Sequence, residues 1–226
     1  MNTIWDPRDK YDFDNWSVHE CGQITLKSKI GQFLFMAGKN KTIQSYLEVG
    51  TWNGYGSTRC IIEGLKRRNE DTPSYVFYSL ECNPEKCKQA QDLYKDIPNV
   101  HILNEVFLNN MPSDIYNIFP ELKENATFRY WNSVDFDNMK NKSLFTDRKD
   151  LPEMFDVVLL DGGEFTTWYE YLEIKDRCKI LALDDTTAPK CKQIVKEIKA
   201  QPKRWKIILD DPKERNGSIV AQRIDI

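Results

Sequence analysis

The sequence predicts an α/β fold: a doubly wound, mostly parallel sheet of seven strands with an antiparallel edge strand and helices on both faces. Along the chain, stretches with an apolar period of two alternate in regular order with stretches of period 3.6. The segment FDVVLLD (155–161) contains the continuous apolar run VVLL, as expected of a strand buried on both faces of a parallel sheet. The last two predicted strands follow each other with no helix between them, which favours an antiparallel pair at the edge.

The first half of the chain contains three of these strands. Residues 22–38 are amphipathic and end at a glycine, which is typical of a helix. The basic residues of the helix predicted over 56–68 lie near its carboxyl end, as the helix dipole prefers. The elements expected here are helix 22–38, strand 45–50, helix 56–68, strand 75–81, a helix beginning at Pro84 and strand 100–107.

The second half begins with residues 108–152, which have no clean period and are longer than an ordinary connection in an α/β fold. We interpret them as an insertion. The elements expected after it are strand 155–161, helix 166–177, strand 179–185, helix 188–200 and strands 205–210 and 218–226.

The length of 226 residues predicts a single domain over 1–226, in which segment 1–44 is helical and covers the functional site. The first residues carry acidic groups and no apolar stretch, so neither a signal peptide nor an anchor is expected. No later run approaches the roughly 18 apolar residues of a membrane span. The sequence therefore predicts a cytoplasmic protein that does not act at a membrane.

Charge and cysteine content limit the partners. The formal net charge is −3, from 32 basic and 35 acidic residues spread along the chain, so nucleic acid is not an expected partner. The six cysteines form no C-x-x-C pair, which does not indicate zinc, and we expect reduced thiols packed as small apolar side chains. The expected partner is a small-molecule or carbohydrate acceptor. The oligomeric state stays open, a homodimer included.

The strongest motif is a glycine-rich loop, residues 48–57, that leads from a strand directly into a helix. Its glycines allow the backbone to approach a ligand closely, and the helix N-terminus offers free amides to a carboxylate. Alone, such a loop is as typical of a simple tight turn as of a ligand-binding site. Glu81 ends the next strand, where a carboxylate can accept both hydroxyls of a ribose. Together the two features predict a nucleoside cofactor.

The charge of Glu48 favours one cofactor over another. Dinucleotide sites usually use the tighter pattern G-x-G-x-x-G, whereas here Gly54 and Gly56 follow Gly50. A carboxylate at the strand end would repel the phosphates of NAD and attract the ammonium and sulfonium of S-adenosylmethionine. The sequence therefore favours S-adenosylmethionine.

Four segments carry a family resemblance: 31–57 (GQFLFMAGKNKTIQSYLEVGTWNGYGS), 79–85 (SLECNPE), 155–165 (FDVVLLDGGEF) and 180–186 (ILALDDT). They resemble the successive motifs of class I methyltransferases, over roughly three quarters of the chain. The closest resemblance is to the cation-dependent O-methyltransferases that act on catechols and caffeoyl-CoA, and to antibiotic-sugar O-methyltransferases. The fold that this resemblance implies is Rossmann-like.

The resemblance also implies roles for individual residues. Glu81 would hold the ribose, Cys82 and Asn83 would flank the adenine, and Asp161 would lie at the cofactor as well. The methionine part would contact Glu48, Gly50, Thr51, Trp52, Asn53, Gly54 and Ser57. One departure is that the family's serine falls one place earlier, where this chain has Gly56.

Acidic residues follow the fourth and fifth predicted strands. Because neighbouring parallel strands lie about 5 Å apart, we expect these carboxylates to converge. Such oxygen ligands suit Mg²⁺ or another hard divalent cation. In the resembling cation-dependent enzymes the metal ligands match Asp161, Asp184 and Asp185, with an Asn in place of the last. The alternative is that Asp184 or Asp185 caps the turn before the helix predicted at Ala188.

The expected catalytic residues are Asp161, Glu164 and Asp185. A bound cation would activate and position a substrate hydroxyl for attack on the methyl group. Without a metal, one of the carboxylates could act as general base. The catechol enzymes have a lysine where this chain has Glu164, so Glu164 is expected to act as the base or to contact substrate.

Histidines and aromatic residues give weaker signals. His101 lies in a predicted strand and is expected to be structural, whereas His19 belongs to the segment that could fold over the site. Three aromatic residues either form the floor of a sugar or phenol site or pack in the core: Trp131, Trp168 and Tyr169.

The function expected from these features is S-adenosylmethionine-dependent O-methylation of a hydroxyl on a sugar, a glycan or another small molecule, assisted by a divalent cation. Two alternatives stay open: a metal-independent N-methyltransferase, in which the acids would meet an amine, and a non-catalytic module that binds S-adenosylmethionine. NAD-dependent oxidoreduction is disfavoured by Glu48. The segments expected to form the acceptor pocket are 1–44 and 108–152.

Overall fold

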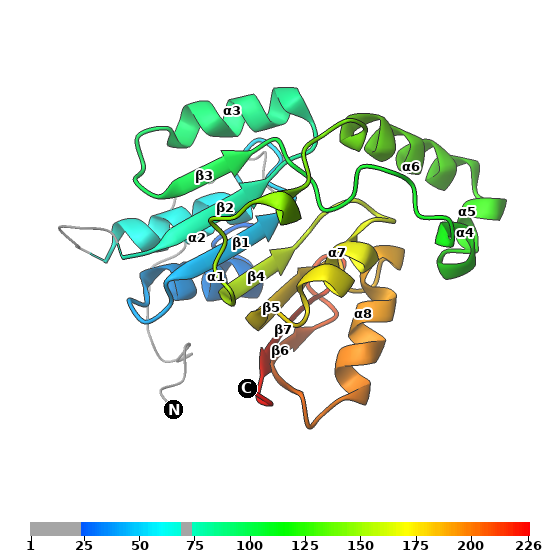
Figure 1. The fold of residues 1–226 in the computed structure, drawn as a ribbon. Helices are drawn as coiled ribbons and strands as arrows, with labels where there is room; N and C mark the ends of the chain where they lie inside the picture. Colours follow the sequence, from blue (N-terminus) through cyan, green and yellow to red (C-terminus); the bar gives the residue numbers. More distant parts are fainter. Residues whose placement is uncertain (1–23, 69–73) are drawn as a thin grey trace.

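The computed structural model describes residues 24–68 and 74–226, which fold around one mixed sheet of seven strands (Figure 1). The strands are β1 (Ser45–Val49), β2 (Val76–Leu80), β3 (Val100–Leu103), β4 (Phe155–Leu160), β5 (Cys178–Asp184), β6 (Trp205–Asp211) and β7 (Ser218–Arg223). Their order across the sheet is β3-β2-β1-β4-β5-β7-β6. The predicted seven-stranded α/β fold is therefore confirmed.

The sheet reverses its winding between β1 and β4. β1 pairs in parallel with β2 on one side and with β4 on the other, and β3 and β5 extend the two halves in parallel. β7 is antiparallel to both of its neighbours, β5 and β6, so the predicted antiparallel pair forms this edge with β6 outermost. In open sheets of this kind, ligands bind beyond the carboxyl ends of the strands, where the winding reverses.

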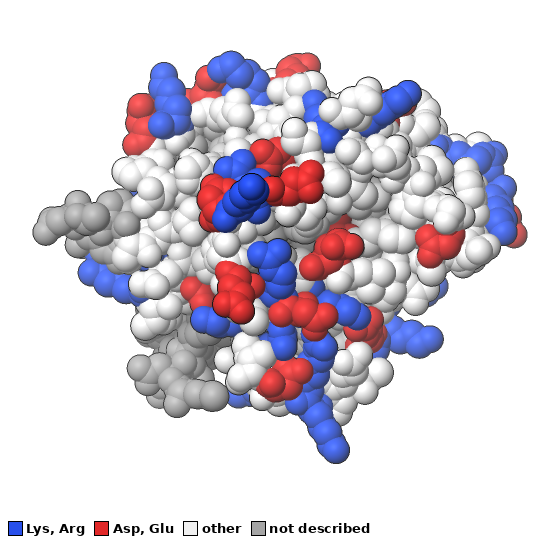
Figure 2. Space-filling model, viewed as in Figure 1, with Lys and Arg blue, Asp and Glu red and all other residues white. Residues whose placement is uncertain are grey.

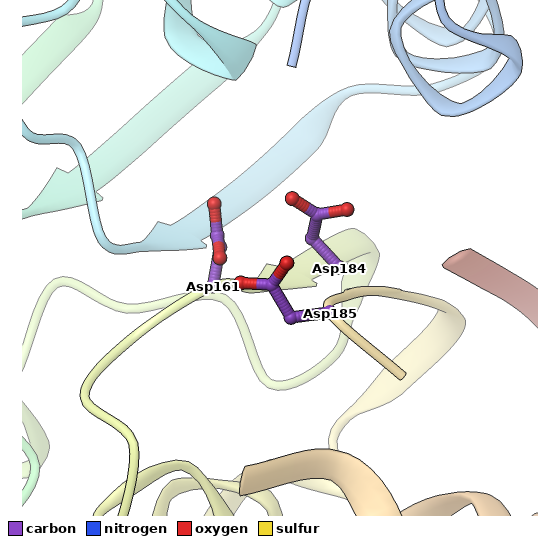
Figure 3. Close-up of side chains that lie close together, drawn as sticks. All are labelled: Asp161, Asp184 and Asp185. Atoms are coloured by element: carbon purple, nitrogen blue, oxygen red, sulfur yellow. The ribbon is translucent and has the colours of Figure 1, made fainter. Parts of the chain in front are cut away.

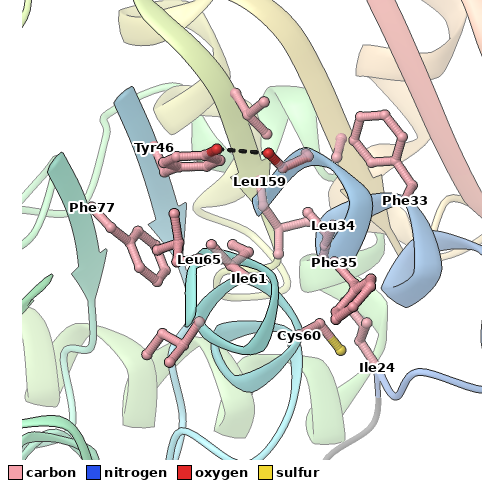
Figure 4. Close-up of a cluster of buried hydrophobic side chains, with 14 of the residues drawn as sticks. Ile24, Phe33, Leu34, Phe35, Tyr46, Cys60, Ile61, Leu65, Phe77 and Leu159 are labelled. Carbon is pink, nitrogen blue, oxygen red and sulfur yellow. Dashed lines mark hydrogen bonds between the residues drawn. The ribbon is translucent and has the colours of Figure 1, made fainter. Parts of the chain in front are cut away.

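Helices cover both faces of the sheet (Figure 1). They are α1 (Lys29–Lys39), α2 (Ser57–Lys66), α3 (Pro84–Tyr94), α7 (Thr167–Ile174) and α8 (Pro189–Ala200). α1 and α2 pack on one face with Tyr46 and Phe77 (Figure 4), and α3 packs on the same face. α7 and α8 pack on the other face with Leu47. The neighbours Tyr46 and Leu47 point to opposite faces because side chains alternate along a strand. Both are buried, since both faces are covered.

The first helix begins later than the predicted range 22–38. Ser28 caps it, because its Oγ accepts a hydrogen bond from the N–H of Gly31. Ile24 and Leu26 are buried but precede the helix in irregular structure. The apolar pattern before Ser28 therefore reflects packing against the core rather than a helical turn.

Gly38 lies inside α1 instead of ending it, because α1 and α2 cross closely at this point. A Cβ at Gly38 would lie 2.4 Å from the carbonyl oxygen of Ile61, and one at Gly64 would lie 2.2 Å from the carbonyl oxygen of Phe35. Each glycine thus gives room to the backbone of the other helix. The glycine that suggested a helix end is a packing residue.

The insertion, residues 108–152, is largely helical. It contains α4 (Ile115–Ile118), α5 (Glu121–Glu124), α6 (Ala126–Met139) and a 3₁₀ helix (Phe145–Asp147). Its small core contains Ile115, Phe119, Leu122, Phe136 and Met139 and contacts the rest of the fold through Phe165. α4 and α5 have four residues each, which is too short for an apolar period to be visible in the sequence.

The third predicted strand is also shorter than its range of 100–107. β3 ends at Leu103, and Val106 instead forms an isolated bridge with Leu144 of the insertion. The apolar residues beyond Leu103 therefore serve to attach the insertion to the sheet.

Some expectations concern residues outside the described ranges. His19, Cys21 and most of the expected covering segment 1–44 belong to them. In the described ranges, Cys60, Cys82, Cys87, Cys178 and Cys191 are free thiols. No helix in these ranges has the length and apolar character needed to cross a membrane.

Charged side chains of both signs are interspersed on the face shown in Figure 2. That face offers no continuous basic surface to a phosphate backbone, although the absence of a nucleic-acid partner stays a prediction.

Candidate functional site

A cavity of about 580 Å³ opens at the carboxyl ends of β1, β2, β4 and β5, where the winding of the sheet reverses. One residue after each strand lines it: Gly50 after β1, Glu81 after β2, Asp161 after β4 and Asp185 after β5. From α6 the insertion adds Val134, Asp135, Asn138 and Met139 to the wall. The cavity lies where the strand pattern predicts a ligand site, and the insertion forms part of it.

The loop after β1 folds back over the end of β2. The N–H groups of Gly50 and Thr51 donate to the carbonyl of Leu80, at 3.0 and 3.1 Å. Gly50 has a φ of +98°, and a Cβ there would lie 2.1 Å from the carbonyl oxygen of Asp161. Only glycine fits this position. Of the loop residues predicted to bind cofactor, those that line the cavity are Gly50, Thr51, Trp52, Asn53 and Ser57.

Gly54 does not line the described cavity, so its predicted contact with a cofactor is not supported. Its carbonyl accepts a hydrogen bond of 2.6 Å from the hydroxyl of Tyr94 on α3. The positive φ of +83° at Gly54 turns the loop toward that helix. Gly54 therefore holds the loop against α3.

The carboxylate of Glu48 lies beneath the loop, fully buried and away from the cavity wall. It accepts hydrogen bonds from the hydroxyls of Ser57, Thr58 and Ser79, the one from Thr58 at 2.6 Å. This position does not support the predicted contact between Glu48 and a cationic part of the cofactor, because three hydroxyls already surround the carboxylate. The charge argument against a dinucleotide, which rested on Glu48, is lost with it.

This burial gives Glu48 a measurable effect on stability. Burial raises the pKa of Glu48 from 4.5 to about 7, against the opposing effect of hydrogen bonds from Ser57, Ser79 and Thr58. A raised pKa means that folding is most favourable while the group is protonated. The stability that Glu48 contributes is therefore fully present below pH 4.5 and is lost as the pH rises through about 7.

We expect Glu48→Gln to gain stability relative to the wild type as the pH rises, by roughly 3 kcal/mol between about pH 4 and about pH 8. Glutamine keeps the shape of the side chain and carries no charge to bury. Urea denaturation of both proteins at the two pH values measures the difference, and other titrating groups cancel in the comparison. A difference independent of pH would show that Glu48 titrates near its usual value.

Glu81 faces the cavity and is anchored by backbone amides. Its two oxygens accept hydrogen bonds from the N–H groups of Trp52 and Asn83, at 2.6 and 2.8 Å. Burial raises the pKa of Glu81, and these two amides oppose the rise. Cys82 and Asn83 also line the cavity, and the Asn83 side chain caps α3. Each carboxylate oxygen retains a lone pair for a ligand hydroxyl.

The three predicted metal ligands converge at the ends of β4 and β5 (Figure 3). Asp161, Asp184 and Asp185 each offer one oxygen, and these oxygens lie within 4.8 Å of one another. Asp161 and Asp185 line the cavity, whereas Asp184 is buried beneath its wall. We call these three residues the acidic rim.

A lysine that the sequence analysis did not identify lies within this rim. The Nζ of Lys190, in the first turn of α8, is 2.7 Å from Asp161 Oδ1 and 2.9 Å from Asp185 Oδ2. Its side chain is only 5% exposed. Burial lowers the pKa of Lys190, but the carboxylates of Asp161 and Asp185 outweigh this effect and raise it, so the group stays charged. The positive charge between Asp161 and Asp185 is therefore the ammonium of Lys190.

Arg215 neutralises the remaining member of the rim. Its guanidinium lies 3.1 Å from Asp184 Oδ2 and 3.5 Å from Asp185 Oδ1. Lys190 and Arg215 thus pair one oxygen each of Asp161 and Asp184 and both oxygens of Asp185. The ammonium of Lys190 lies between Asp161 and Asp185, two of the predicted ligands, and in this arrangement it competes with a divalent cation for their oxygens. The metal stays a prediction.

Three further acids line the cavity and belong to no sequence motif; one of them, Glu105, is paired with Arg148 at 2.9 Å. Asp135 comes from α6 and Glu170 from α7. Burial raises the pKa of Asp135 to about 6 and that of Glu170 to about 7. Thr166 donates to Glu170 Oε1 at 3.0 Å, whereas Oε2 is buried with no hydrogen-bond partner among the residues that the structure describes. A buried oxygen of this kind is costly unless a ligand completes it.

Glu164, the predicted base, is half-buried and does not line the cavity. Burial raises its pKa, and the nearby charge of Lys190 opposes the rise. Asp161, unlike Glu164, lines the cavity and has an oxygen that could accept a proton there. Its Oδ1 pairs with Lys190, while no hydrogen bond to Oδ2 is found within the described ranges. The expected catalytic role of Glu164 is therefore not supported by its position.

The predicted aromatic floor is also absent from the wall formed by the described residues. Trp168 packs against Tyr171, with ring centroids 5.7 Å apart, and the Tyr169 hydroxyl donates to Asp114 at 2.8 Å. Trp131 is 46% exposed. His101 stacks on Tyr78 with centroids 5.1 Å apart, in the structural position expected for it.

Comparison with known proteins finds the fold among solved structures; no family model and no curated protein matches the chain. An O-methyltransferase from Bacillus cereus in complex with S-adenosylhomocysteine (SAH) is 15% identical, with a TM-score of 0.51; the match covers 86% of this chain and 80% of that one. An SAH-bound methyltransferase from Podospora anserina is 16% identical, with a TM-score of 0.50 and coverage of 87% and 78%. Cofactor-bound Rv0187 from MTB is 15% identical, with a TM-score of 0.52 and coverage of 90% and 84%. At such identities the likeness establishes the Rossmann-like methyltransferase fold.

Proposed function

We propose that the chain is an S-adenosylmethionine-dependent O-methyltransferase that acts on a hydroxyl of a sugar, a glycan end or another small molecule. The observation that carries the proposal is the position of Glu81: its carboxylate, anchored by the N–H groups of Trp52 and Asn83, faces a cavity at the point where the sheet reverses. Two oxygens held in this way suit the paired hydroxyls of a ribose. The fold shared with SAH-bound structures supports the choice of cofactor.

The sheet order supports the same choice against a dinucleotide. Dinucleotide-binding folds have the parallel order 3-2-1-4-5-6. Here the antiparallel β7 is inserted between β5 and β6. This argument replaces the one from the charge of Glu48, which the buried position of that side chain removes.

In the proposed complex, Glu81 binds the ribose and Cys82 and Asn83 lie at the adenine. The residues from Gly50 to Asn53 hold the methionine part with their backbone. Glu48 acts indirectly, because the hydroxyls of Ser57 and Thr58 bind it from the start of α2 and fix the end of the loop. Its role is to position the loop rather than to contact the cofactor.

The proposed reaction is a single displacement. The acceptor oxygen forms a bond to the methyl carbon while the bond from that carbon to sulfur breaks, and the electron pair of the broken bond stays on sulfur. The sulfonium becomes the neutral thioether of SAH. The hydroxyl proton passes to a carboxylate of the cavity, and we propose Asp161 Oδ2 as its acceptor.

Cavity size and lining support a small acceptor. A volume of about 580 Å³ falls within the range of about 300–1,000 Å³ that is usual for small-molecule sites. Asp135 and Asn138 of the insertion add polar groups that could bind the hydroxyls of a sugar. The preference for a carbohydrate rests on these groups and on the family resemblance of the sequence.

One observation favours a second candidate, transfer to an amine. Glu170 Oε2 is buried without a partner in the described part of the chain, and Asp135 lies on the same cavity. The ammonium of an amine acceptor would donate a hydrogen bond to Glu170 Oε2 and place a positive charge opposite the two carboxylates. The proton would then be lost from nitrogen before attack, because only the free amine has a lone pair to donate.

The proposal predicts that the purified chain binds SAH and S-adenosylmethionine with dissociation constants in the micromolar range, as measured by isothermal titration calorimetry. Incubation with labelled S-adenosylmethionine and matched hydroxyl and amine acceptors should then identify the acceptor class. NADH is the control ligand and should not bind. Binding of NADH but not of SAH would contradict the proposal, and SAH binding without transfer to any acceptor would favour a non-catalytic module.

A further inference from the structure

The position of Lys190 has a chemical consequence for the proposed reaction. Its ammonium lies between carboxylate oxygens on two neighbouring strand ends, at 2.7 Å from Asp161 and 2.9 Å from Asp185. The side chain is 5% exposed and lines the cavity. A buried lysine held by two carboxylates has a fixed position and a fixed charge.

The hydrogen bonds of this ammonium leave one donor for a ligand. Two of its three N–H groups point to Asp161 Oδ1 and Asp185 Oδ2, and its only other polar contact within residues 24–68 and 74–226 is a long one of 3.5 Å to the carbonyl of Gly162. An acceptor oxygen entering the cavity can displace that contact and accept a charge-assisted hydrogen bond.

We propose that Lys190 is a built-in cation that takes the place of a divalent metal in this site: its Nζ binds the acceptor oxygen, and the chain transfers methyl groups without a metal ion. The inference rests on the proposed methyl transfer. During the reaction the ammonium stabilises the negative charge that develops on the oxygen, and the hydroxyl proton goes to Asp161 as before. Lys190 keeps all of its protons, so it acts as a donor and not as a base.

The balance of charge supports this assignment. The acidic rim has three carboxylates, which Lys190 and Arg215 reduce to one excess negative charge. Removing Lys190 alone would leave two excess negative charges on oxygens within 4.8 Å of one another. That arrangement suits a divalent cation. The lysine and a metal ion are therefore alternatives at this position.

The direct test measures metal binding without any substrate. Manganese is added as the chloride to the wild type and to Lys190→Met, whose side chain is one atom shorter, unbranched and uncharged. Bound Mn²⁺ is measured by the loss of its free electron paramagnetic resonance signal. We expect the wild type to bind no Mn²⁺ at this position and the variant to bind one ion. Lys192→Met is the matched control, since Lys192 is exposed on the same helix, and it should behave like the wild type.

Thermal unfolding with and without Mg²⁺ gives a second measurement that remains informative if the variant is less stable than the wild type. Unpaired carboxylates destabilise Lys190→Met, and Mg²⁺ should raise its Tm while leaving that of the wild type unchanged. Binding of Mn²⁺ by the wild type with the same affinity as by the variant would overturn the inference. So would the absence of both Mn²⁺ binding and Mg²⁺ stabilisation in the variant.

Measurements of methyl transfer and of SAH affinity distinguish a failure of this inference from a failure of the proposed function. Wild-type transfer should be unchanged by EDTA, and Lys190→Met should lose at least about 100-fold in kcat. SAH affinity should stay close to that of the wild type in both proteins. A wild type that requires a metal overturns the role of Lys190 and leaves methyl transfer standing, whereas failure to bind SAH overturns the proposed function without affecting the Mn²⁺ result.

Discussion

Glu81→Ala should lower the affinity for SAH by at least about 100-fold. The carboxylate offers two charge-assisted hydrogen bonds to a ribose, and each is worth about 1.5–3 kcal/mol. The substitution also leaves the N–H groups of Trp52 and Asn83 without their acceptor, so the loop loses one of the contacts that join it to the end of β2. Isothermal titration calorimetry with SAH measures the loss directly.

Two variants control for this effect. Glu81→Gln keeps the shape and one acceptor oxygen, so its affinity should fall between those of the wild type and Glu81→Ala. Glu85→Ala removes an exposed acid in the first turn of α3 and should bind SAH normally. If Glu81→Ala kept the affinity of the wild type, the ribose would have to bind elsewhere and the proposed cofactor pose would be wrong.

The strands were predictable because each has a simple local signal. β4 contains the continuous apolar run Val157–Leu160 since helices cover both of its faces, and the alternation of Tyr46 and Leu47 between two cores follows from strand geometry. The start of α1 was harder to place, because Ile24 and Leu26 are apolar for packing reasons and mimic a further helical turn. The short helices α4 and α5 hold too few residues for a period.

At the site, positions along the chain were predictable and side-chain directions were not. Glu48 and Glu81 both end strands, yet Glu48 turns under the loop toward Ser57, Thr58 and Ser79, whereas Glu81 faces the cavity. These hydroxyls come from α2 and β2, so only the packed fold brings them to Glu48. Asp135 and Glu170 reach the same cavity from α6 and α7 with no shared motif.

Lys190 had one signal that sequence analysis could have used. It lies in the first turn of α8, where the helix dipole disfavours a cation, and no acidic residue is present in that turn. A lysine in such a position needs partners elsewhere, and Asp185 lies five residues earlier at the end of β5. Lys192 lies in a similar helical position but is exposed. The choice between the two lysines required the structure.

The strictest steric requirement at the site is that of Gly50. Its N–H donates to Leu80 of β2 at 3.0 Å, and the N–H of Asp161 donates to Val49 at 2.9 Å, so Gly50 lies between the ends of two strands. A Cβ there would meet the carbonyl oxygen of Asp161 at 2.1 Å, and backbone cannot move aside as a side chain can. The φ of +98° adds strain for any other residue.

Gly50→Ala should therefore lower the free energy of unfolding by about 3 kcal/mol or more and abolish SAH binding, because separating β1 from β4 displaces both the loop and the acidic rim. Urea denaturation and calorimetry measure the two effects. Gly54→Ala is the matched control: its φ is similar, at +83°, but its Cβ would meet the Tyr94 ring edge at 2.9 Å. It should cost only about 1 kcal/mol. Equal losses in the two variants would mean that strain in φ, and not the approach of Asp161, determines the need for glycine at this strand end.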